Sequence, residues 1–229
     1  MGDSFSATLY AVAADGTINY GPSETSSIKD YLIEQIDLAT SSAELKTLAV
    51  DMLHYGAAAQ INFAYDTANL VNSDLTAAQL ALGTQEEPSA VNGFVQSASG
   101  CRVNTSVSIG SKVELYLTFI YKPTASSKME LRIKNAKGDV IETLTPDYTV
   151  GANYRAVYDN VGAKQMRDLI TIELYDNDVL VSKSTTWSVE TYVAQVIENS
   201  ASAPELVNVC KAMLTYGDAA AAYLESSGQ

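Results

Sequence analysis

The feature that most constrains this chain is an internal repeat. The string Ser27-Ile28-Lys29-Asp30-Tyr31-Leu32 matches Ser188-Val189-Glu190-Thr191-Tyr192-Val193, at an offset of 188 − 27 = 161 residues. The same offset, without a gap, pairs Glu44-Leu45 with Glu205-Leu206, Met52-Leu53 with Met213-Leu214, Tyr55-Gly56 with Tyr216-Gly217 and Ala58-Ala59 with Ala219-Ala220. A repeat of this length indicates one supersecondary unit that occurs twice.

Each copy of the repeat predicts two antiparallel helices. The first helix begins at a serine cap, Ser27 or Ser188, and the second follows a short polar joint at residues 40–42 or 200–202. Apolar or small residues recur in the first copy at steps of three and four, namely Leu45, Leu48, Ala49, Met52, Gly56, Ala59 and Phe63. We expect this stripe to bury against the partner helix.

A β-hairpin is expected before each helix pair. Residues 7–12 and 17–23 flank Asp15-Gly16, which is a strong hairpin turn signal. Residues 170–175 and 179–185 flank Asp176-Asn177-Asp178 in the second copy. The repeated unit is therefore predicted to be a hairpin followed by two helices.

A run of short strands is predicted between the two copies, in residues 99–186. Turn signals stand at Gly110-Ser111, at residues 136–139 and at Gly151-Ala152-Asn153, and residues 113–122 alternate between apolar and more polar side chains. This pattern is typical of an antiparallel β-sandwich. The fold class expected is α+β, a sandwich flanked in sequence by two helical hairpins. We expect a first lobe at residues 1–98, which ends in a linking segment with a short helix at residues 75–80, and a second lobe at residues 99–229.

Composition excludes several partners. The chain has 14 Lys and Arg against 27 Asp and Glu, a net charge of −13, and a surface that negative repels phosphate backbones and anionic lipid. No apolar run reaches the roughly 18 to 20 residues that span a bilayer. With 47% apolar and 18% charged residues, the chain is expected to be soluble and globular, without nucleic-acid binding or membrane insertion.

Metal and cofactor sites are not expected. The two cysteines, Cys101 and Cys210, show no metal or redox spacing, so both are predicted to be free, and a disulfide between them is the less favoured alternative. Together with the single histidine, His54, they cannot supply the usual four ligands of a Cys/His zinc site.

The two repeated strings carry a family resemblance. SIKDYL…LAVDMLHYGAAAQINFAY and WSVETY…VCKAMLTYGDAAAAYL resemble a module of secreted and wall-associated proteins of gut Firmicutes, in which such helices follow a β-sandwich. Some modules of this general kind resemble the starch-adherence proteins of bacterial amylosomes, which hold α-1,4-glucan without cleaving it. The resemblance implies a secreted or cell-surface location and, by analogy, binding of starch.

No constellation of residues predicts catalysis. The sequence has no phosphate loop, nucleophile elbow or HExxH motif. Glu44 and Glu205 occur in both copies, and we expect them in the first turn of a helix, where a carboxylate favours the helix dipole, rather than as a glycosidase pair. The repeat partner of His54 is Thr215, which favours a plain surface histidine. Residues 176–178 favour a hairpin turn over a calcium loop.

Aromatic side chains are the remaining signal for binding, because sugar rings stack their C–H faces on aromatic planes. Tyrosines present in both copies are explained by the fold, so Tyr20, Tyr65 and Trp187, which have no aromatic counterpart, are candidates. Tyr116 joins them because alternation places it on the outer face of its strand, and Tyr154 and Tyr158 because they share one face of another strand. We predict a ligand-binding set of Trp187, Tyr20, Tyr65, Tyr116, Tyr154 and Tyr158. Trp187 has a second interpretation, because an apolar residue just before a helix cap often packs on the first turn.

The sequence thus predicts a non-catalytic carbohydrate-binding module for starch or another α-1,4-glucan, within a larger secreted or cell-surface protein. Its expected partners are the polysaccharide and neighbouring modules of the same protein, and the seam between the two lobes is the expected place for the ligand. The alternative is a structural spacer or a protein-interaction module without a glycan ligand. A hydrolase would require two acids at glycosidase distance in the folded chain.

Overall fold

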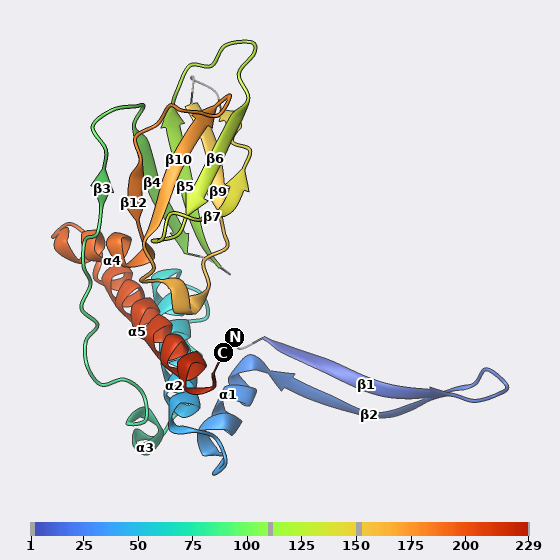
Figure 1. The fold of residues 1–229 in the computed structure, drawn as a ribbon. Coiled ribbons are helices and arrows are strands. Elements are labelled where there is room, and N and C mark those ends of the chain that lie inside the picture. Colours follow the sequence, from blue (N-terminus) through green and yellow to red (C-terminus); the bar gives the residue numbers. More distant parts are fainter. Residues whose placement is uncertain (1–2, 110–111, 150–152, 229) are drawn as a thin grey trace. The chain divides into compact units, whose positions relative to one another are not determined.

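The computed structural model describes residues 3–109, 112–149 and 153–228. Within these ranges the chain is a mixed α and β protein with five α-helices and antiparallel sheets, which agrees with the α+β class expected (Figure 1). The helices are α1 Ile28–Asp37, α2 Ala43–Asn62, α3 Ala77–Leu80, α4 Val189–Glu198 and α5 Pro204–Ser226, and η1 Ala163–Gln165 is a 3-10 turn. The strands are β1 Ser4–Val12, β2 Ile18–Ser27, β3 Val95–Gln96, β4 Val103–Ile109, β5 Val113–Ile120, β6 Met129–Lys134, β7 Val140–Leu144, β8 Asp147–Thr149, β9 Asn153–Tyr158, β10 Ile170–Asp176, β11 Val179–Leu180 and β12 Thr185–Trp187.

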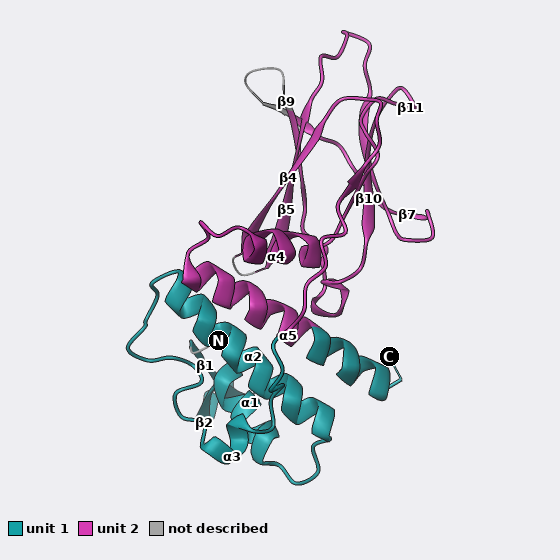
Figure 2. Cartoon of the chain, turned by 90° about the vertical axis from the view of Figure 1, so that its left-hand side faces the viewer, with its two compact units in different colours: residues 1–87, 218–229 teal, residues 88–217 magenta. Residues whose placement is uncertain are grey.

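The chain divides into two compact units (Figure 2). Unit 1 consists of residues 1–87 and 218–229, and unit 2 of residues 88–217. The lobe boundary between residues 98 and 99, which follows from the predicted start of the run of strands, stays a prediction. Among the described residues, no helix combines the length and apolar character needed to cross a membrane.

The helices of unit 1 begin where the serine signals predict. The Ser27 hydroxyl accepts a hydrogen bond from the Asp30 N–H at 3.0 Å and donates one to the Asp30 carboxylate at 2.8 Å. The Ser42 hydroxyl accepts from the Leu45 N–H at 3.2 Å. These bonds satisfy backbone donors that have no partner within the helix. α1 then packs closely along α2.

The core of unit 1 uses the predicted stripe of α2 only in part, since Ala49 is buried in it and Met52 packs against it. Leu45, Leu48 and Met52 are only half-buried, and Phe63 is 52% exposed. The reason is that the chain after α2 returns to cover a neighbouring face, since Val71 and Leu75 join the core cluster. The other buried members of this cluster are Leu32, Ile36, Ala49, Val50, Leu53 and Ala57.

A buried carboxylate fastens the segment after α3 to α2. Asp51 is 1% exposed, and its two oxygens accept hydrogen bonds from the Thr84 N–H at 3.0 Å and the Thr84 hydroxyl at 2.7 Å. Gly83 permits this approach, because a Cβ there would lie 2.6 Å from Cγ1 of Val50. Desolvation raises the pKa of the Asp51 carboxyl, although its bonds to Thr84 oppose the rise.

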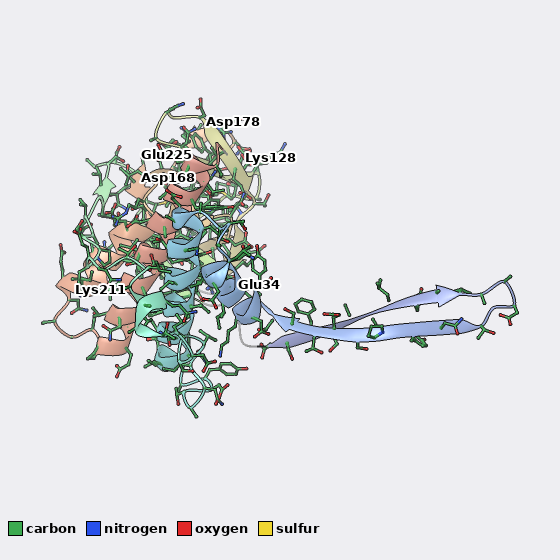
Figure 3. The ribbon with its side chains drawn as sticks, turned by 90° about the horizontal axis from the view of Figure 1, so that it is seen from below. Glu34, Lys128, Asp168, Asp178, Lys211 and Glu225 are labelled. Atoms are coloured by element: carbon green, nitrogen blue, oxygen red, sulfur yellow. The ribbon has the colours of Figure 1, made fainter. Side chains whose placement is uncertain are left out.

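The hairpin β1–β2 forms a two-stranded antiparallel sheet that extends away from α1 (Figure 1). Its turn is the predicted one, since Gly16 has φ +86°, and the Thr17 N–H donates to the Asp15 carboxylate at 2.9 Å. Every residue of β1 is exposed, and so is β2 up to Thr25. Figure 3 shows the side chains of this hairpin projecting from both of its faces.

Unit 2 contains two antiparallel sheets. One has the strand order β3-β12-β10-β6-β7, with β11 paired to β10, and the other has the order β4-β5-β9-β8. Figure 2 shows the strands β4, β5 and β9 on one side of unit 2 and the strands β10 and β7 on the other. Fully buried apolar side chains come from both sheets, and they include Leu115, Leu117, Phe119, Leu131, Ile133, Ile172 and Leu174.

The alternation predicted for residues 113–122 is present over the length of β5, residues 113–120. Val113, Leu115, Leu117 and Phe119 are buried, whereas the residues between them are not. The predicted turn at residues 136–139 is also present, with Gly138 at φ +88° and its N–H donating to the Asn135 carbonyl at 3.0 Å. The turns predicted at Gly110-Ser111 and at Gly151-Ala152 lie outside the described residues.

The two helix pairs start at corresponding residues. Adding 161 to the bounds of α1 gives Val189 and Glu198, the bounds of α4, and the start of α2 maps in the same way to Pro204. The Ser188 hydroxyl accepts from the Thr191 N–H at 3.1 Å, as Ser27 does in α1.

Candidate functional site

A pocket of about 380 Å³ lies within unit 2, where several loops and strand ends converge. It is lined by the turn between β6 and β7, the end of β9, the segment from η1 to β10, and the junction between β12 and α4. The volume is at the lower end of the range of small-molecule sites.

The floor of the pocket is buried and largely apolar. Its residues are Tyr158, Ile170, Trp187, Ser188 and Val189. Trp187 lies opposite Ile170 in the register of β12 and β10, and it is only 1% exposed. The Tyr158 hydroxyl donates to the Asn160 carbonyl at 3.3 Å, and burial raises the pKa of this phenol, which therefore stays protonated at neutral pH.

The rim of the pocket is exposed and mixes apolar with polar groups. Its residues are Lys137, Ile141, Gln165, Asp168 and Leu169. Ile141 and Leu169 are 45% and 41% exposed, which is high for large apolar side chains. The rim can therefore offer both a hydrophobic contact and charged hydrogen-bonding groups to a ligand.

Local hydrogen bonds hold the polar parts of the rim in place. The Asn135 side-chain oxygen accepts from the Lys137 N–H at 2.9 Å and from the Asp139 N–H at 3.0 Å, which fixes the turn that carries Lys137. On the facing segment, the Asp168 N–H donates to the Gln165 carbonyl at 3.0 Å. Both side-chain charges are thus carried on backbone that is itself hydrogen-bonded.

The chemistry available at this pocket is that of binding a hydroxyl-bearing ligand. Lys137 can donate hydrogen bonds, Asp168 can accept them, and the apolar groups of the rim and floor can contact C–H surfaces. Among the described residues that line the pocket, Asp168 alone carries a carboxylate. Outside the pocket, no cluster of three or more metal-ligating side chains occurs in the described part of the chain.

Of the six residues predicted from the sequence, the structure brings Trp187 and Tyr158 together in this pocket. Tyr154 is half-buried and shares the face of β9 that carries Tyr158, opposite Phe119 of β5. Because Phe119 is fully buried, this is the inward face of the sheet.

The other three predicted residues lie elsewhere. Tyr116 is on the opposite face of β5, where its hydroxyl donates to Glu114 at 3.0 Å and the Arg155 guanidinium lies 4.1 Å from its ring centre. Tyr20 and Tyr65 belong to unit 1 and are 70% and 62% exposed. The Tyr20 ring centre lies 6.1 Å from that of Tyr10 on β1.

The sequence did not single out the rim residues Lys137, Ile141, Asp168 and Leu169. The turn at residues 136–139 was a usable local signal, and the structure confirms that turn. This turn lies beside residues 165–169 in the pocket only because of how the sheets fold, and no short-range sequence pattern predicts that proximity.

The residues set aside as structural occupy the expected positions. Glu44 and Glu205 lie in the first turns of α2 and α5. Asn177 and Asp178 have positive φ angles in the tight turn between β10 and β11. Both cysteines are free, and Cys210 is fully buried on α5, where desolvation raises the pKa of its thiol to about 12.

No protein-family model matches this chain, and neither a curated protein nor a solved structure matches it at a significant level. The case for a function therefore rests on the pocket and on the sequence.

Proposed function

We propose that the chain is a non-catalytic carbohydrate-binding module whose ligand occupies the pocket of unit 2. The observation that carries this proposal is the presence, in one pocket, of a floor containing Trp187 and Tyr158 and a rim with exposed apolar and charged side chains. Sugar rings present C–H faces to apolar surfaces and hydroxyls to charged groups, so both parts of the pocket suit them.

The ligand class we propose is a neutral α-1,4-glucan. Lys137 and Asp168 provide one charge of each sign at the rim, which suits a ligand that both accepts and donates hydrogen bonds. A net charge of −13 on the chain opposes polyanionic glycans. The choice of an α-glucan, and of a larger secreted or cell-surface protein with neighbouring modules, follows the resemblance to starch-adherence proteins.

We further propose that the two sheets of unit 2 form an antiparallel β-sandwich and that the two helical segments arose by duplication. Buried side chains from β5, β6 and β10 support the sandwich. The shared 161-residue offset of the helix bounds supports the duplication.

The alternative function, a spacer or protein-interaction module, is favoured by one observation. Trp187 is 1% exposed, as expected of a residue that packs beneath the cap of α4 rather than one that stacks on a sugar. In that case the pocket is a surface hollow without a glycan ligand.

The single tryptophan makes the test direct, because Trp187 lies in the floor of the pocket and is the only Trp of the chain. Titration with maltooligosaccharides should change its fluorescence, and starch in a native gel should retard the protein. The same mixtures should contain no shortened glucan. A chain that neither changes its emission nor is retarded would remove the glucan proposal, and reproducible release of product would contradict the non-catalytic one.

Rim variants then locate the site. Asp168→Ala and Lys137→Ala should each weaken binding about tenfold, the loss of roughly one hydrogen bond to a charged group. Asp147→Ala and Lys122→Ala are matched controls, since both residues are exposed in unit 2 and neither lines the pocket. If the controls weaken binding as much as the rim variants, the ligand binds elsewhere.

A further inference from the structure

We propose that the chain forms a two-fold symmetric dimer in which the β1 strands of two copies pair edge to edge. The proposal concerns unit 1, and it is independent of the pocket in unit 2. It rests on the exposure of the hairpin, on the different character of its two edges and on the residue pattern of β1.

The hairpin β1–β2 carries apolar surface that no described residue covers. Phe5 is 62% exposed, Leu9 86% and Tyr10 64% on β1, and Ile18 and Tyr20 on β2 are 48% and 70% exposed. An isolated two-stranded hairpin is marginally stable in water, and it gains stability when further strands join it. This surface is therefore one that pairing would stabilise.

The free edge of β1 has none of the features by which proteins prevent strand addition. Its nine residues, Ser4–Val12, include no charged residue and no proline. β2 differs, because it contains Gly21, Pro22 and Glu24, and the pairing register shifts opposite Gly21 and Pro22. Proline, charge and irregular pairing all discourage addition to an edge, so strand addition is expected at β1 and not at β2.

The edge of β10 that corresponds to the free edge of β1 is paired with another strand in unit 2. β10 precedes the turn at Asn177 and Asp178 as β1 precedes the turn at Gly16, and β12 ends at the cap of α4 as β2 ends at the cap of α1. The outer edge of β10 pairs with β6 over six residues. The corresponding edge of β1 has no partner strand in the described chain.

The pattern of β1 makes a second copy a suitable partner. In an antiparallel pair related by a two-fold axis, the axis passes through the centre of a residue pair, so odd-numbered residues meet odd-numbered ones. The odd positions of β1 are Phe5, Ala7, Leu9 and Ala11, all apolar, and they would form one continuous row on the joined sheet. Because the β2 edges are protected, such assembly stops at two copies.

Sedimentation of the purified full chain tests the proposal. A monomer–dimer equilibrium without larger species is expected, and added salt should strengthen it, because each copy carries a net charge of −13 and salt screens the repulsion. A monomer at every concentration would overturn the proposal and leave the edge to a different β-sheet partner. An open series of larger species would overturn it as well.

A pair of matched variants assigns the interface. Ala7→Lys places a cation on the β1 row, where the two copies meet, while Glu24 directly opposite it on β2 keeps the hairpin itself paired. Asn19→Lys adds the same charge to β2, opposite Ala11 and away from the free edge. The first should weaken the dimer at least tenfold and the second should leave it unchanged. Equal behaviour of the two folded variants would exclude the β1 edge.

Discussion

The hairpin β1–β2 and its counterpart formed by β10, β11 and β12 occupy the same place in the chain but differ in their surroundings. Each hairpin runs through a tight turn and ends at a serine that caps a helix, Ser27 or Ser188. β10 is paired on both sides, by β6 and β12, and its apolar residues Ile170, Ile172 and Leu174 are buried. β1 is paired on one side, and all of its residues are exposed.

The difference shows that a hairpin in this chain is buried where further strands pair with it. The side chains at the base of each hairpin match its degree of burial. The base of the second hairpin pairs Ile170 with Trp187, whereas the base of the first pairs Phe5 with Ser26. A large aromatic is present in the hairpin that pairs with further strands and is buried, and a serine is present in the hairpin that pairs with none in the described chain. Local turn and cap signals are nevertheless the same in both.

The largest expected effect on stability comes from Trp187, which tests whether the two hairpins differ in burial. Trp187→Ala should lower the free energy of unfolding by about 3 to 5 kcal/mol, because it empties a fully buried position beneath α4. The matched variant Ser26→Ala, at the corresponding position of the first hairpin, should change it by less than about 0.5 kcal/mol. Urea unfolding followed by circular dichroism measures both, since the first variant lacks the tryptophan reporter.

A small loss for Trp187→Ala, accompanied by a large loss of glucan binding, would contradict the packing interpretation. It would show that the indole serves the ligand more than the fold.

The next effect concerns the two serine caps, whose loss is expected to lower stability by similar amounts. Ser27→Ala and Ser188→Ala should each lower stability by about 0.5 to 2 kcal/mol, because each hydroxyl accepts a hydrogen bond from a first-turn N–H of its helix. Thermal or urea unfolding measures the two losses. If one cap proves dispensable, the two helix starts are not energetically equivalent.

The smallest expected effect on stability concerns Asp51, a carboxylate that the second copy of the repeat lacks. Asp51 corresponds to Ala212, and burial raises the pKa of its carboxyl. The folded chain therefore holds this proton more tightly than the unfolded chain, and the Asp51 contribution to stability falls as pH rises from about 4 through the raised pKa. Asp51→Asn keeps an acceptor for the Thr84 N–H, so it should be at least as stable as the parent at neutral pH and lose this advantage on acidification.

Asp74 provides a control of opposite sign for the pH series. Its pKa is lowered by the hydrogen bond and charge of Lys29, so the charged form favours folding and that contribution is lost as pH falls. Asp74→Asn should thus lower stability slightly at neutral pH. Denaturant midpoints measured across the acid range for both variants distinguish the two signs.

Local signals of the sequence were enough to predict much of the fold. Ser27 and Ser188 mark the starts of two helices, Asp15-Gly16 and residues 176–178 form tight turns, and the alternation in β5 separates buried from exposed positions. Each of these depends on interactions within a few residues. The stripe on α2 was partly wrong because the segment at Val71 and Leu75, distant in sequence, covers a different face.

The candidate site was less accessible to sequence reasoning. Sequence reasoning singled out Trp187 because its repeat counterpart is a serine, and Tyr158 because it shares a strand face with Tyr154. Both residues line the pocket, but that reasoning could not report that both are buried. It also grouped them with Tyr20, which lies in unit 1. The rim charges at Lys137 and Asp168 come together only through the folding of the sheets, and neither residue has a distinctive neighbour in sequence.

The thiol of Cys210 has a practical consequence for studying this molecule. It is fully buried on α5 and its pKa is about 12, so a thiol reagent can modify it only when that helix opens to solvent. Cys101 is partly exposed in the same unit, so its labelling serves as an internal control that the reagent is active. The labelling kinetics of Cys210 therefore measure how often the C-terminal helix detaches, in the native protein and without any substitution.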